Sequence, residues 1–169
     1  MTNKPVTLKM RKMNRILTLL TLLLLLSSCV LDSEKEPSLW TQEQITIQNT
    51  LKTAYAEGLQ NEGDSLKIDA HFHPQFTMIA RKPSDSLRFV KLRGWRAAKI
   101  KARAEGKLPL EGGHKVSIKF QSIDIAQDVA VAKVDYYEGE RLSYIDFMSL
   151  YKIKGEWKII SKVFTKIEE

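Results

Sequence analysis

The C-terminal third of the chain alternates between apolar and polar residues, and this pattern constrains the fold more than any other feature. Four segments with this alternation fit residues 115–126, 129–138, 142–153 and 156–166. They are connected by Gln127-Asp128, Gly139-Glu140 and Lys154-Gly155, all short and polar. Because a repeat of two is that of a β-strand, and short polar connections are typical of hairpins, we expect a four-stranded antiparallel meander.

The region before the meander indicates three helices and two strands. Thr41 and Gln44 have the spacing of a capping box, and apolar residues follow at helical spacing until Asn61 and Gly63 end the helix. Asp64 can cap a short helix over residues 65–72, which Pro74 stops. Residues 76–80 and 87–91 are predicted strands around a turn at 82–85, and residues 94–105 are a predicted helix. Helices followed by a meander predict an α+β domain, with the helices packed on one face of the sheet.

The first 29 residues have the order of a secretory signal. Residues 1–15 are basic and polar, residues 16–26 are an apolar run, and Ser27-Ser28 precede Cys29. The apolar run is eleven residues long, whereas a helix that crosses a bilayer needs about 20. Cys29 is the single cysteine of the chain, so it has no intramolecular disulfide partner. We predict a signal peptide over 1–28, a tether over 29–39 and one domain over 40–169.

Leu26-Ser27-Ser28-Cys29 resembles the lipobox of bacterial lipoproteins, whose cysteine is acylated. The resemblance implies that fatty chains such as palmitate attach Cys29 to a membrane, and two or more chains anchor a protein stably. Val30 follows Cys29, where an aspartate would favour retention in the inner membrane, so the resemblance implies the outer membrane. The acidic residues of 32–36 resemble signals for the cell surface but also fit a solvated tether. The expected location is therefore the outer membrane, on its periplasmic side or at the cell surface.

The charge of the chain is unevenly distributed. The formal net charge is +7, but five of the 27 basic residues and none of the acidic ones precede Cys29, which leaves 22 basic against 20 acidic residues. A nearly neutral exported domain is not expected to bind nucleic acid. A basic series remains between residues 88 and 107, around Trp95. It fits either an anionic ligand or, as we favour, a solvated helix face.

The predicted order of elements and three stretches of sequence together resemble a known fold family. The stretches are Gly63-Asp64 leading to Phe72-His73-Pro74, residues 128–134, and residues 146–164. They resemble the nuclear transport factor 2-like superfamily, in particular its putative lumazine-binding branch. The resemblance implies a cone-shaped fold in which a curved, mostly antiparallel sheet wraps around the N-terminal helices and leaves a pocket. Seven residues are predicted to line that pocket: Tyr55, Phe72, His73, Phe76, Met78, Trp95 and Tyr136.

Because superfamily members include both enzymes and non-catalytic proteins, the fold alone does not assign chemistry. We expect non-catalytic binding of a small apolar or amphipathic molecule, or of a partner protein, and no cofactor. One alternative is an enzyme of isomerase or dehydratase type with Asp146 or His73 as base. Another is a structural envelope protein that docks through an open sheet face. His71 and His73 alone do not make a metal site, because zinc sites take three or four ligands.

Asp146 allows two interpretations. A buried carboxylate has a raised pKa, which suits proton transfer. However, a two-residue turn at Gly139-Glu140 places Lys133 opposite Asp146 and Asp135 opposite Tyr144, and opposite charges across two strands stabilise a sheet. We therefore favour a structural ion pair between Lys133 and Asp146.

The same register divides the side chains of the meander between two faces. One face, predicted to be covered by helices, contains Ala132, Val134, Tyr136, Ile145, Phe147, Tyr151, Ile160 and Phe164. The other is predicted to be open and contains Val131, Tyr144, Met148, Leu150, Trp157 and Ile159. An open apolar face is often an interface, and the family resemblance implies a homodimer.

Overall fold

A computed structural model describes residues 40–168, which lie within one compact unit of residues 40–169. The predicted signal peptide, the predicted acylation of Cys29 and the predicted tether fall outside the described residues. Among the residues that are described, no helix combines the length and apolar character needed to cross a membrane.

Within residues 40–168, four helices longer than one turn precede or interrupt the strands. They are the α-helix Gln42–Leu51 (α2), the π-helix Lys52–Glu62 (η1), and the α-helices Ser65–His71 (α3) and Leu92–Ala104 (α4). The predicted capping box is present, with the Thr41 side chain accepting from the Gln44 backbone and the Gln44 side chain accepting from the Thr41 backbone. The Asp64 side chain caps α3 as predicted, and Gly63 ends η1 in the left-handed conformation, which glycine adopts without strain.

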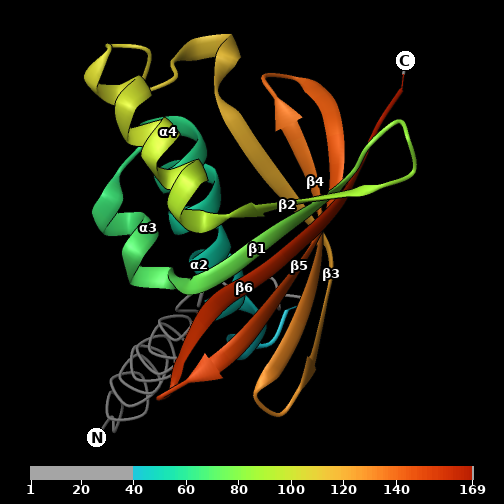
Figure 1. The fold of residues 1–169 in the computed structure, drawn as a ribbon. Helices are drawn as coiled ribbons and strands as arrows, with labels where there is room; N and C mark the ends of the chain where they lie inside the picture. The colour runs from blue at the N-terminus through green and yellow to red at the C-terminus, as the bar shows by residue number, and fades with distance from the viewer. Residues whose placement is uncertain (1–39, 169) are drawn as a thin grey trace, which may run out of the picture. The chain divides into compact units, whose positions relative to one another are not determined.

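The strands form one six-stranded sheet in the order β2-β1-β6-β5-β4-β3. Their bounds are Phe72–Arg81 (β1), Leu87–Lys91 (β2), Val116–Ala126 (β3), Val129–Glu138 (β4), Arg141–Ile153 (β5) and Glu156–Lys166 (β6). A short 3₁₀-helix, Gly112–His114 (η2), precedes β3. Only the pair of β1 and β6 is parallel among these strands, so the predicted meander is present and the sheet is mostly antiparallel. The helices lie on one side of the sheet (Figure 1).

An extra residue in β5 makes the predicted register of this strand wrong. Tyr137 pairs with Leu142, but Tyr136 pairs with Tyr144, so Ser143 bulges out of the ladder. Beyond the bulge Lys133 lies opposite Phe147, and Asp146 lies opposite Val134. A shift of one residue moves every later side chain to the other face of the sheet. The predicted ion pair of Lys133 with Asp146 therefore does not form, and Asp135 lies opposite Ile145 rather than Tyr144.

The predicted division of faces is corrected for the same reason. Ala132, Val134 and Tyr136 do face the helices. Their partners on β5 are Met148, Asp146 and Tyr144, whereas Phe147 and Tyr151 are exposed on the other face. A second bulge, at Ile160 in β6, keeps both Trp157 and Lys162 on the covered face. The covered and open faces are called the inner and outer face below.

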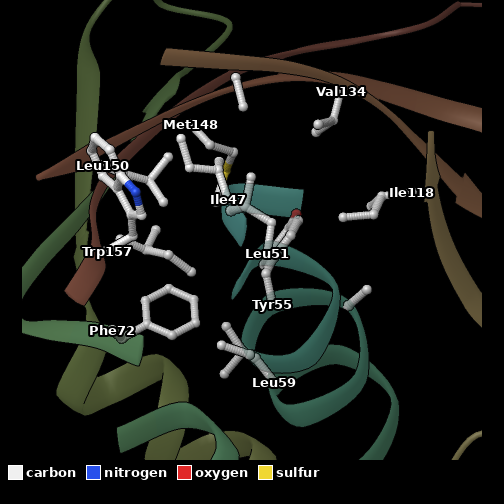
Figure 2. Close-up of a cluster of buried hydrophobic side chains, with 14 of the residues drawn as sticks. Ile47, Leu51, Tyr55, Leu59, Phe72, Ile118, Val134, Met148, Leu150 and Trp157 are labelled. Carbon is white, nitrogen blue, oxygen red and sulfur yellow. The ribbon is translucent and has the colours of Figure 1, made fainter. Parts of the chain in front are cut away.

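The core lies between the inner face and the two N-terminal helices. Figure 2 shows Leu51, Tyr55 and Leu59 directed from the helices towards side chains of the sheet, which include Val134 and Met148. The buried members of this core come from residues 47–159, all inside the compact unit. Residues 40–169 therefore supply their own core and can be studied as a separate domain.

Candidate functional site

The inner face carries a buried ion pair that joins β5 to β6. Lys162 Nζ lies 2.7 Å from Asp146 Oδ2, and the two residues are 4% and 0% exposed. Asp146 pairs with Phe164 and Met148 pairs with Lys162 in the ladder, so the two charges are diagonal neighbours on one face. Removing two charges from water is costly unless each is paired and hydrogen-bonded. The pair is thus a feature that the fold must stabilise by further contacts.

Tyr55 of η1 supplies the first of these contacts. Its hydroxyl donates to Asp146 Oδ2 over 2.8 Å, and Lys162 Nζ donates to the same hydroxyl oxygen over 2.5 Å. Three aromatic rings surround the ammonium group, with centroids 4.8 to 5.3 Å away, and belong to Phe164, Tyr55 and Tyr136. Ring faces attract a cation most strongly where water is excluded. Lys162 therefore occupies an aromatic cage closed by one carboxylate.

Burial sets the direction of the pKa shifts in this cluster. Desolvation raises the pKa of Asp146 above its ordinary value, while the Lys162 ammonium and the Tyr55 hydroxyl oppose the rise. Desolvation lowers the pKa of Lys162, and Asp146 opposes this fall. Burial and the neighbouring Asp146 charge raise the pKa of Tyr55, so its phenol stays protonated and can donate. Asp146 Oδ1 is buried and has no hydrogen-bond partner among the described residues.

A cavity of about 200 Å³ lies against this cage and is called the chamber below. Its lining is rich in aromatic rings, and Lys162 is the cation among the lining residues. The rings contact one another edge to face, as between Tyr136 and Tyr144, whose centroids are 5.5 Å apart. The chamber is lined by Tyr55, Gln60, Met78, Trp95, Tyr136, Glu138, Tyr144, Lys162 and Phe164.

Four of the seven predicted pocket residues come together in the chamber: Tyr55, Met78, Trp95 and Tyr136. Phe72 and Phe76 are instead core residues, packed on each other with ring centroids 4.9 Å apart. Phe76 lies behind the chamber wall, because its ring centroid is 6.2 Å from that of Trp95. His73 does not line the chamber; its Nδ1 accepts from the Gln75 backbone N–H over 3.2 Å.

Sequence reasoning missed Lys162, Gln60, Glu138, Tyr144 and Phe164. Phe164 and Lys162 stand two residues apart, which marked them as neighbours on one face of a strand. Nothing in the pattern marked Lys162 as the partner of Asp146, because that pairing depends on the bulge at Ile160. Asp146, a candidate base only under the enzyme alternative, is not among the lining residues of the chamber.

The basic series around Trp95 is partly neutralised on α4 and beside it. Arg96 makes two hydrogen bonds to the Asp69 carboxylate, of 2.8 and 2.6 Å. Lys101 lies 3.7 Å from Glu105. Arg103 lies 3.7 Å from Asp64. These contacts are typical of a solvated helix face, the interpretation favoured from the sequence.

The fold and the chamber define the class: a cone-shaped α+β domain of the nuclear transport factor 2-like type. A structure from Shewanella baltica OS155 described as such a protein of unknown function has a TM-score of 0.60 and 22% identity, over 76% of this chain and 96% of that one. A structure from Silicibacter pomeroyi DSS-3 with the same description has a TM-score of 0.60 and 20% identity, over 76% of this chain and 100% of that one. At such identities the likeness concerns the fold.

Residues 42–165 match the family model described as putative lumazine-binding, and the chain belongs to this family. A comparison with curated proteins gives no match. The fold and the family branch expected from the sequence are therefore confirmed.

Proposed function

We propose that the protein is a lipid-anchored envelope protein whose domain holds a small amphipathic molecule in the chamber without changing it chemically. The observation that supports this most is an aromatic cavity whose buried cation is already neutralised. Ligand sites are typically concave, mainly apolar and provided with a few placed polar groups. The chamber has five aromatic rings and three polar groups besides the tyrosine hydroxyls, those of Gln60, Glu138 and Lys162. The family description makes lumazine, a planar bicyclic molecule, a reasonable first probe.

Binding is favoured over catalysis by the surroundings of the two candidate bases. A general base must lie within hydrogen-bond reach of the proton that it removes. Asp146 is not a lining residue of the chamber, and its Oδ2 is held by Lys162 and Tyr55. His73 lies outside the chamber lining. Isomerase or dehydratase chemistry would need another base.

The anchoring part of the proposal is supported by the sequence before residue 40. The lipobox-like Leu26-Ser27-Ser28-Cys29 and the preceding apolar run support acylation of Cys29 and export. Mass spectrometry of the N-terminal peptide from host membranes should find Cys29 as the first residue, with its acyl chains, in the outer-membrane fraction. An uncut peptide with an unmodified Cys29 would contradict this part alone.

A second proposal, a homodimer through the outer face, is supported by a different observation. Phe147 and Val163 are opposite each other on this face and are 44% and 48% exposed. Val131 and Tyr151 continue the exposed apolar surface. Contiguous apolar surface of this kind marks interaction sites. Sedimentation equilibrium of residues 40–169 should give twice the monomer mass, and a monomer would favour docking to another envelope protein.

A thermal-shift screen tests binding in the chamber. Residues 40–169 are heated with a panel of small aromatic and amphipathic molecules, lumazine included. A ligand at about 100 times its dissociation constant adds about 2.7 kcal/mol to the free energy of unfolding, so binders raise the melting temperature. Met78→Trp fills the chamber and should abolish the shift, while Leu66→Trp at an exposed position of α3 should preserve it. Shifts that survive Met78→Trp would contradict chamber binding.

A further inference from the structure

The chamber adjoins a second hollow of about 540 Å³, called the vestibule below. Gln60, Tyr136 and Glu138 line both. One molecule can therefore contact the two spaces at once. The other lining residues of the vestibule are Lys99, Leu110, Gly113, His114, Val116 and Arg141.

The vestibule differs from the chamber in its charges. Its carboxylate, Glu138, is already engaged, because Oε2 accepts from Arg141 over 2.8 Å and from the Ser143 hydroxyl over 2.9 Å. Lys99 is half-buried and has no carboxylate oxygen within 4.0 Å in residues 40–168. Its recorded hydrogen bond is a long one, 3.4 Å, to the Gln60 carbonyl oxygen. Lys99 therefore has capacity for an anion.

The backbone holds Lys99 in this position. A Cβ added at Gly63 would lie 2.6 Å from the Lys99 carbonyl oxygen, so the end of η1 packs directly on α4. Burial lowers the pKa of Lys99, with Glu138 opposing, because the ammonium has lost water without gaining a close carboxylate. An anion bound there would restore the lost stabilisation.

Lys162 is a much weaker site for an anion than Lys99. Asp146 at 2.7 Å already balances its charge, and the three rings occupy its surroundings. A second anion in the chamber would lie near the buried Asp146 carboxylate and be repelled by it. The chamber thus suits the uncharged part of a ligand, and the vestibule suits the anionic part.

We infer that the ligand is an amphipathic carboxylate, with an aromatic or apolar body in the chamber and its anionic group on Lys99 in the vestibule. This inference rests on the proposed function, and it adds the chemical class and orientation of the ligand. His114 lines the same hollow and can add a donor to the anionic group.

Calorimetric titration with matched probes tests the inference. Cinnamate and phenylbutyrate are each compared with their uncharged amides on residues 40–169. The carboxylates should bind about tenfold more tightly than the amides, because a hydrogen bond to a charged group is stronger than one to a neutral group. Lys99→Met should remove this preference and leave amide binding unchanged. Lys101→Met is the control, because Lys101 is on the same helix, is exposed and is paired with Glu105.

The outcomes separate the inference from the proposed function. Equal binding of acid and amide overturns the inference and leaves chamber binding intact. A carboxylate preference that survives Lys99→Met but is lost in Lys162→Met overturns the assignment to the vestibule. If neither acids nor amides bind, the inference falls together with the proposed function.

Discussion

Asp146 and Phe147 are adjacent in β5, yet their exposure is the reverse of their polarity. The carboxylate is 0% exposed on the inner face, and the apolar ring is 44% exposed on the outer face. A strand that served only stability would have the opposite arrangement, because burying a charge costs free energy and exposing an aromatic ring gains none. Each face of this sheet therefore carries a residue that stability alone does not favour, the buried Asp146 beside the chamber and the exposed Phe147 on the face of the proposed dimer.

The largest expected effect comes from breaking the inner pair. Asp146→Ala leaves the Lys162 ammonium buried without its carboxylate, and we expect a loss of about 3–5 kcal/mol in the free energy of unfolding. Urea denaturation of residues 40–169 measures this loss. Lys133→Ala is the matched control, because Lys133 would be the partner under the register predicted from sequence. A loss after Lys133→Ala as large as that after Asp146→Ala would contradict the observed pairing.

Replacing Lys162, the other member of the pair, should make the free energy of unfolding depend on pH. In Lys162→Met the carboxylate of Asp146 loses its opposing cation, so its folded-state pKa stays above the ordinary 3.8. The folded state then binds the proton more tightly than the unfolded state, and stability is lost as pH rises through the folded pKa. The slope is up to about 1.4 kcal/mol per pH unit. Urea denaturation at several pH values should show it, and the double variant Asp146→Asn with Lys162→Met should not.

Asp64 is only partly buried, with a side chain 26% exposed, and its pKa shifts in the opposite direction to that of the buried Asp146. Hydrogen bonds from the backbone N–H groups of Lys67 and Leu66 lower its pKa below 3.8. Its stabilisation is therefore present above that value and is lost as pH falls through the folded pKa. Asp64→Ala should cost about 1 kcal/mol at neutral pH. Asp64→Asn should retain most of the cap but flatten the acid dependence, and an unchanged acid limb would argue against this role.

The smallest effect on folding is expected on the outer face. Phe147→Ser changes an exposed side chain, so the free energy of unfolding should change by about 0.5 kcal/mol or less in the monomer. Sedimentation equilibrium should nevertheless show loss of the proposed dimer. A Phe147→Ser protein that stays dimeric would place the interface elsewhere.

Local sequence signals predicted most of the fold. The limits of β3 to β6 follow from alternation and from the Gly139-Glu140 and Lys154-Gly155 turns, and the first helix begins where the Thr41 capping box places it. The limits of β1 were not predicted, since it begins at Phe72 and not at Phe76. The family resemblance correctly implied the cone. These features are set by residues that are close to one another in the sequence, so sequence patterns predict them directly.

The site was only half predictable because it depends on register. The two bulges lie at Ser143 and Ile160. Neither residue is a glycine or a proline, so the sequence does not mark either bulge. Without these bulges, alternation places Asp146 and Met148 on the wrong face. Lys162 looked like one of many surface lysines, and its partner was assigned to Lys133. Tyr55, Trp95 and Tyr136 were predicted correctly as pocket residues because that prediction used apolar spacing and the family resemblance, neither of which depends on the register of the strands.

Native mass spectrometry of the full-length protein, isolated from the membranes of its own host, tests ligand binding most directly. We expect one small molecule per subunit, released at higher collision energy, with a negative charge in solution and an aromatic or apolar body. Recovery of the protein only at the mass of its acylated polypeptide, with no binding of the aromatic carboxylates or their amides, would contradict ligand binding in the chamber.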